Sequence, residues 1–242
     1  FHAGISEDFQ SFRVLAGERL TGVDKTLYDK LKDFVSQIAA AGGSTKKEFT
    51  PTELGIGKAT YTNTELGISG NLLVNGTDGK LTLTDEAMSA VLGMMFDDSA
   101  VVNALMVDCP YELYWFDKTT GWSSGIGCSF DTSKLTEITV TKISFTLNVA
   151  QEYAKKSGDG KYFPTEMDSA IPQKVTTAKT KASEIVSKYA GKTNFEILDG
   201  YRQEICDLVE YNEAALAPNY PYGDPWQLIY VFDGDTSTKV VC

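Results

Sequence analysis

The stretch Leu135-Thr-Glu-Ile-Thr-Val-Thr-Lys-Ile-Ser-Phe-Thr-Leu-Asn-Val149 contains the clearest strand pattern in this chain. Apolar and polar residues alternate along it, which is typical of strands with one buried face. The apolar positions are Ile138, Val140, Ile143, Phe145, Leu147 and Val149. They are even-numbered up to Val140 and odd-numbered from Ile143, so we expect two strands separated by a bulge or a short break.

The residues before this stretch resemble a β-hairpin. Segments 111–116 and 122–130 form its predicted arms, and Lys118-Thr-Thr-Gly121 forms its turn. Together with residues 135–149 they predict an antiparallel meander. Aromatic residues fall on both faces of the first arm, which indicates a strand covered on both sides. The alternative is a ligand-binding platform for a sugar, built from Trp115 and Trp122.

Cys109 and Cys128 flank this predicted hairpin. In the strand pairing of the predicted hairpin, the two cysteines fall close to opposite positions but not directly opposite each other. A bulge would be needed to place them face to face. We expect two unpaired, buried thiols, with a disulfide bond as the alternative. The cysteines therefore do not indicate whether the protein resides in an oxidising or a reducing compartment.

Helices are predicted on both sides of the meander. Before it, residues 24–41, 85–96 and 99–107 have helical spacing, with Asp24, Thr84 and Asp98 in N-cap positions. After it, residues 155–172 are polar and predict a linker. The remaining chain is helical: one helix ends at Gly191, and a capping box at Thr193-Asn-Phe-Glu196 opens the next.

The fold class predicted from this order is α+β, with antiparallel strands and hairpins packed against helices. We expect two domains. Residues 1–170 form an α+β accessory lobe, and residues 171–242 form a helical segment.

The composition excludes some partners. The chain has 242 residues and a formal net charge of −11. Such a charge argues against nucleic acid and against an anionic membrane surface. No apolar run approaches the roughly 20 residues of a membrane helix, so we expect no membrane span. The chain starts at Phe1 without Met, which predicts a processed or trimmed product, and a removed signal peptide would not be visible in it.

The residue types also limit the chemistry. His2 is the only histidine, and the four cysteines lack Cys-x-x-Cys spacing, so we expect no metal site. Asp233-Gly-Asp235 begins like a calcium loop but lacks the glutamate that completes one. There is no phosphate loop and no dinucleotide fingerprint, and we expect no cofactor. Cysteine chemistry remains, but Cys242 has neither a following helix nor a histidine partner in this chain, so the residues alone predict a truncated strand end rather than a working nucleophile.

The sequence from about Val175 to Cys242 resembles the opening of a bacterial transglutaminase-like domain of the papain-fold superfamily. The matching pieces are the helix that ends in Leu208-Val-Glu-Tyr-Asn212, the proline-rich loop 218–225, and the approach Thr238-Lys-Val-Val-Cys242. In that family the nucleophilic cysteine opens a helix, and a histidine and an aspartate come later in the chain. Val240 stands where many members have glycine.

The resemblance implies that Cys242 is the nucleophile and that Tyr211 is a core residue behind it. It also implies that the domain is incomplete here, because the nucleophile's helix, the histidine and the aspartate are absent. The parent would be a secreted or surface bacterial protein that acts on amide bonds of a protein or peptide through a cysteine thioester. We expect this chain by itself to be inactive. The alternative is a non-catalytic surface adhesion module that binds protein or cell-wall or surface glycan.

Overall fold

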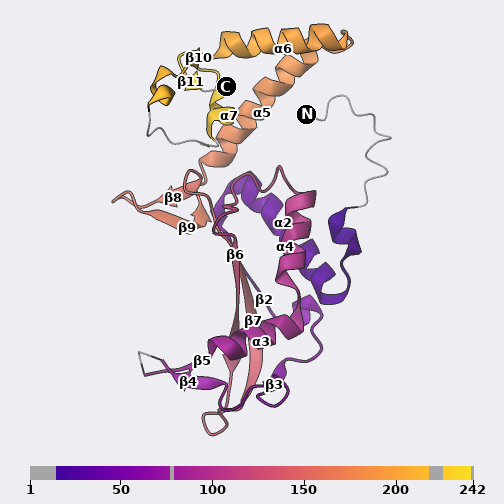
Figure 1. The fold of residues 1–242 in the computed structure, drawn as a ribbon, viewed down its shortest axis with the longest axis vertical. Coiled ribbons are helices and arrows are strands. Elements are labelled where there is room, and N and C mark those ends of the chain that lie inside the picture. Colours follow the sequence, from indigo (N-terminus) through magenta and orange to yellow (C-terminus); the bar gives the residue numbers. More distant parts are fainter. Residues whose placement is uncertain (1–14, 77–78, 218–225, 241–242) are drawn as a thin grey trace. The chain divides into compact units, whose positions relative to one another are not determined.

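The computed structural model describes residues 15–76, 79–217 and 226–240, and it has the predicted α+β fold (Figure 1). The chain forms two compact units. Among the described residues, the sheet unit contains those from 15 to 150 and from 154 to 167, and the C-terminal unit contains 151–153, 168–217 and 226–240.

Strand β7 (Glu137–Leu147) is the centre of the sheet unit. Strand β6 (Trp122–Ser129) pairs along one side of it, and β2 (Lys46–Phe49) and β3 (Thr60–Thr62) pair with different parts of its other side, all antiparallel. Its buried side chains are Ile138, Val140, Ile143, Phe145 and Leu147. The pattern of residues 135–149 therefore predicted the buried face correctly.

A bulge in β7 explains the change of parity. Gly127 pairs with Lys142, whereas the next residue, Cys128, pairs with Val140. Thr141 is therefore the extra residue, and it turns the apolar side chains before and after it to the same face. The predicted irregularity is confirmed as a bulge within one continuous strand.

The predicted first arm of the hairpin is wrong. Residues 110–115 form consecutive turns, in which the Leu113 N–H donates to the Cys109 carbonyl at 3.0 Å and the Phe116 N–H donates to the Leu113 carbonyl at 3.1 Å. Only Phe116 makes a bridge, to Val149. These local hydrogen bonds replace a strand ladder, and β6 takes β7 as its partner instead.

Three helices of the sheet unit lie close to their predicted positions. They are α2 (Gly22–Ala41), α3 (Asp85–Met95) and α4 (Asp98–Asp108). Thr84 caps α3 as predicted, but the caps of the other two helices are Thr21 and Asp97. Asp24 instead accepts a hydrogen bond from the Asp97 N–H at 2.9 Å, which joins the first turn of α2 to the start of α4.

Shorter elements complete the sheet unit: η1 (Ala16–Arg19), β1 (Gly43–Ser44), η2 (Thr52–Leu54), β4 (Leu73–Asn75), β5 (Leu81–Leu83), β8 (Ala154–Lys156) and β9 (Tyr162–Met167). Strands β4 and β5 form a hairpin, and β9 pairs with both β1 and β8. The predicted linker 155–172 is therefore largely a β-hairpin. Its pairing with β1, more than a hundred residues earlier, carries no local sequence signal.

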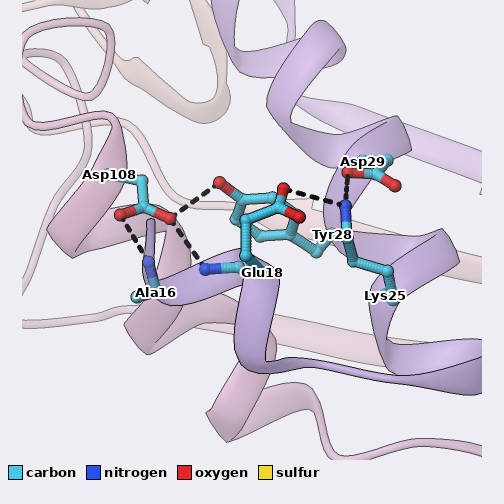
Figure 2. A network of polar contacts seen from close by, with 7 residues as sticks. Ala16, Glu18, Lys25, Tyr28, Asp29 and Asp108 are labelled. Carbon is cyan, nitrogen blue, oxygen red and sulfur yellow. Dashed lines mark hydrogen bonds and ion pairs between the residues drawn. The ribbon is translucent and has the colours of Figure 1, made fainter. Parts of the chain in front are cut away.

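One carboxylate joins three elements of the sheet unit (Figure 2). Asp108, the last residue of α4, accepts hydrogen bonds from the backbone N–H groups of Ala16 and Gly17 at 2.9 and 2.8 Å. It also accepts one from the Tyr28 hydroxyl on α2 at 2.8 Å. A negative charge at a helix C-terminus is unfavourable with respect to the helix dipole, and these three donors offset that cost.

The Asp108 contacts require a glycine nearby. A Cβ atom at Gly17 would lie 2.1 Å from the Tyr28 ring, so only glycine allows η1 to approach this ring. Desolvation raises the pKa of Asp108, but hydrogen bonds from Gly17, Ala16 and Tyr28 lower it by more, so the carboxyl pKa lies below its usual value. Desolvation and the bond to Asp108 raise the pKa of Tyr28.

The C-terminal unit contains helices and two short strands. Its elements are α5 (Ile171–Lys188), α6 (Asn194–Leu208), β10 (Glu210–Tyr211), η3 (Glu213–Leu216), α7 (Trp226–Val231) and β11 (Lys239–Val240). Helix α5 ends shortly before Gly191, close to its predicted end. Residues 226–231 are thus a short helix that leads, through a turn, to β11.

Within residues 15–76, 79–217 and 226–240, no single helix has the length and apolar composition needed to cross a membrane. Helices α3 and α4 meet both criteria only when taken as a pair, and they are bent by 59° at the break between them.

Replacing Asp108 with asparagine should destabilise the protein by about 1–3 kcal/mol at neutral pH, because an amide cannot accept all three hydrogen bonds equally well. The folded-state pKa of Asp108 is depressed, so its contribution is complete above the ordinary aspartate pKa of about 3.9 and is lost as the pH falls below it. Urea unfolding of both proteins across this range measures the difference. Asp33→Asn, an exposed carboxylate on α2, is the control, and an equal effect of the two changes would contradict the role of Asp108.

Candidate functional site

The candidate nucleophile, Cys242, and the only histidine, His2, both lie outside the described residues. The structure describes the approach to Cys242 as far as Val240. The candidate site therefore consists of the elements that hold this approach.

Strands β10 and β11 fix the approach to Cys242. They pair in parallel, with Glu210 opposite Lys239 and Tyr211 opposite Val240. The Glu210 N–H donates to the Thr238 carbonyl at 3.0 Å, and the Asn212 N–H donates to the Val240 carbonyl at 2.9 Å. Val240 is buried, with 7% of its surface exposed. The last described residue before 241–242 is thus held by both its backbone and its side chain.

An acidic turn leads into β11. The Asp233 carboxylate accepts hydrogen bonds from the Asp235 N–H at 2.7 Å and from the Thr238 hydroxyl at 2.9 Å. Asp235 in turn accepts bonds from the Ser237 hydroxyl and N–H, which lower the pKa of Asp235. Both carboxylates therefore stabilise the turn. No group of three or more potential metal ligands from His, Cys, Asp and Glu occurs in the described parts of the chain.

Helix α6 begins with the predicted capping box. The Thr193 hydroxyl accepts a hydrogen bond from the Glu196 N–H, and the Glu196 carboxylate accepts one from the Thr193 N–H at 2.9 Å. The Thr193 backbone bond is the main cause that lowers the pKa of Glu196. The predicted start of the helix is confirmed, and α6 ends at Leu208, two residues before β10 begins.

Tyr189 joins α5 to α6. Its hydroxyl donates to Glu204 at 3.1 Å, and its ring contacts the Tyr201 ring edge-on at a centroid distance of 5.7 Å. Lys188 forms an ion pair with the same Glu204 at 2.9 Å. A Cβ atom at Gly200 would lie 2.0 Å from the Tyr189 ring, so the glycine leaves the space that this ring fills. The sequence did not predict this contact, although a glycine inside a helical pattern is a signal of close packing.

Two predictions about buried residues in this region are wrong. Helix α6 has no buried residue, and Ile205, which its helical spacing with Ile197, Tyr201 and Leu208 predicts as a core position, is 39% exposed. Tyr211, which the resemblance implied to be a core residue, is 46% exposed. The apolar spacing of α6 identifies an amphipathic helix, but spacing alone does not say which element covers its apolar face.

The predicted aromatic platform is not supported by burial. Trp115 is completely buried, so its ring cannot present a face to a sugar, and its predicted strand is a series of turns. Trp122, at the start of β6, is half-buried. Burial of Trp115 thus removes one of the two tryptophans from the predicted platform.

The three described cysteines are unpaired, so the alternative of a Cys109–Cys128 disulfide is wrong. Cys109 is buried and Cys128 is half-buried, and burial is the largest cause that raises the pKa of each thiol. Neither thiol is suited to attack a substrate, because the thiolate is the reactive form. Cys206 on α6 is exposed.

Comparisons with protein-family models, with curated proteins and with solved structures found no match.

Replacing Gly200 with alanine should destabilise the C-terminal unit by about 1–3 kcal/mol, because Tyr189 must move and lose its contacts with Glu204 and Tyr201. The same change normally stabilises a helix by about 1 kcal/mol. Thermal unfolding followed by circular dichroism measures the sign of the effect.

Gly93→Ala in α3 is the matched control, because a Cβ atom there meets nothing within 4 Å, and it should be neutral or stabilising. Adding Tyr189→Ala to Gly200→Ala should remove the clash. If the two glycine changes have the same sign, the contact between Tyr189 and Gly200 does not hold the two helices.

Proposed function

We propose that this chain is part of a secreted or surface bacterial protein of the transglutaminase-like, papain-fold superfamily, and that the parent protein acts on amide bonds through Cys242. The parent protein is the product of the whole reading frame that contains this chain. In this proposal the sheet unit is an accessory lobe, and residues 171–242 open the catalytic domain.

The observation that carries the proposal is the anchoring of the segment immediately before Cys242. The parallel pairing of β10 with β11 and the burial of Val240 restrain this segment. A nucleophile must be held in one position to react with an oriented substrate, and a restrained strand end supports that requirement. The sequence Val240-Val241-Cys242 provides the family resemblance at the same place.

The proposed reaction proceeds in two steps. The Cys242 thiolate attacks the carbonyl carbon of the amide, the C–N bond breaks, and the amine leaves with a proton, which gives a thioester. Water or a second amine then attacks the thioester, its C–S bond breaks, and the thiolate is regenerated. A base must accept the thiol proton, and the resemblance assigns this role to a histidine downstream of Cys242.

The environments of the other thiols support the assignment to Cys242. Burial raises the pKa of Cys109 and Cys128, which keeps both protonated at neutral pH. Cys206 is exposed on α6, and the resemblance gives it no catalytic role. Among the four cysteines of the chain, Cys242 therefore remains the candidate nucleophile.

In the parent protein, Cys242→Ser should abolish formation of hydroxamate from a glutamine-containing peptide and hydroxylamine, because a serine hydroxyl is not ionised by the same base. Cys206→Ser should retain the activity of the unmodified protein. The chain of 242 residues by itself should be inactive. Colorimetric detection of the hydroxamate measures all four samples.

Two results would contradict the proposal. One is equal activity of the Cys242→Ser and unmodified parent proteins. The other is a parent reading frame without a histidine and an aspartate after Cys242.

A further inference from the structure

Strands β10 and β11 are too short to fix their own register firmly. Each has two residues, and Val240 is the only buried residue of the four. Backbone hydrogen bonds join them, from the Glu210 N–H to the Thr238 carbonyl and from the Asn212 N–H to the Val240 carbonyl. A slip by one residue would place the exposed Lys239 side chain where Val240 is now buried. Since so short a pair is marginally stable by itself, the observed register depends on contacts outside the ladder.

Thr238 provides such a contact, because its N–H, its carbonyl and its hydroxyl are all bonded. The N–H donates to the Asp235 carbonyl at 3.1 Å, and the carbonyl accepts from the Glu210 N–H at 3.0 Å. The hydroxyl of this half-buried residue donates to Asp233 Oδ2 at 2.9 Å. The first bond closes the turn, the second begins the pairing with β10, and the third joins both to a carboxylate five residues earlier.

Asp233 is itself held in place. It lies two residues after the end of α7, and its N–H donates to the Tyr230 carbonyl at 3.4 Å. Its Oδ1 accepts a hydrogen bond from the Asp235 N–H at 2.7 Å. Helix α7 in turn contacts α5. The bond between Asp233 and Thr238 therefore ties the start of β11 to the end of a packed helix.

The other polar side-chain contacts described for residues 233–240 do not set the register. The bonds from Ser237 to Asp235 lie within the turn. Lys239 forms an ion pair with Glu210 at 3.4 Å, but the two side chains are 58% and 64% exposed, and exposed ion pairs contribute little to stability. The Thr238 hydroxyl is thus the polar group that accounts best for the position of β11.

We propose that Thr238, held by Asp233, is a positioning residue for Cys242. It sets the register of β11 and thereby the place of the nucleophile four residues later. This inference rests on the proposed function, in which Cys242 attacks the substrate. A slip of one residue displaces an extended chain by about 3.3 Å, whereas a misplacement of about 1 Å can already lower a rate about a hundredfold. Thr238 and Asp233 act through the backbone and do not touch the substrate.

Hydrogen exchange at the Asn212 N–H, which donates to the Val240 carbonyl, measures the pairing in the chain of 242 residues. Thr238→Val keeps the shape of the side chain but removes its hydroxyl, and it should speed this exchange about fivefold or more. Thr238→Ser restores the hydroxyl and should restore slow exchange. Thr236→Val is the matched control, because it makes the same change at an exposed threonine two residues earlier, and it should have no effect.

In the parent protein, Thr238→Val should lower kcat for hydroxamate formation about fivefold or more with little change in KM, because the substrate still binds but the thiol is misplaced. Thr238→Ser and Thr236→Val should retain the activity.

The inference is overturned if Thr238→Val and Thr236→Val change the exchange equally, or if Thr238→Val speeds the exchange and leaves kcat unchanged. The proposed function fails in a different way. A parent protein without Cys242-dependent activity removes the role of the nucleophile, whereas faster exchange in Thr238→Val still shows that Thr238 sets the register of β11.

Discussion

The sheet unit depends on the pairing of β7 on both of its edges. Its backbone groups bond to β6 on one side and to β2 and β3 on the other, while its buried side chains form the centre of the apolar core. The bulge at Thr141 allows both halves of the strand to contribute to this core. Among the helices, hydrogen bonds to the Asp24 and Asp108 carboxylates join α2, α4 and η1 to one another.

Local signals predicted the elements whose structure depends on neighbouring residues. The capping box at Thr193, the cap at Thr84 and the parity change after Val140 each involve residues within a few positions of one another. The same type of signal failed at residues 111–116, because alternating aromatic residues are compatible with both a strand and a series of turns. The backbone hydrogen bonds from the Leu113 N–H to the Cys109 carbonyl and from the Phe116 N–H to the Leu113 carbonyl show that this segment forms turns.

Contacts between distant residues were not predictable from one sequence. Asp108 bonds to residues about ninety positions earlier, and β9 pairs with β1 across a still larger separation. For the candidate site, the sequence indicated the cysteine and the helix before it. It did not indicate that β10 holds β11, because each strand has only two residues. The sequence showed that Gly200 lies within a helical pattern, but it did not show that the Tyr189 ring packs against this glycine.

Two constraints act on the segment that leads to Cys242 in the proposed function. The β10–β11 pairing restrains the backbone of the segment, and the burial of Val240 restrains its side chain. Burial raises the pKa of Cys109 and Cys128, so they are poor nucleophiles. A thiol at the N-terminus of a helix experiences the opposite effect, because the helix dipole stabilises the thiolate.

The most direct test of this proposed role is the pH dependence of alkylation of Cys242 in the parent protein, measured residue by residue with iodoacetamide and mass spectrometry. We expect Cys242 to titrate well below the value of about 8.5 for a free thiol. Titration of Cys242 at or above that value would contradict its role as an activated nucleophile.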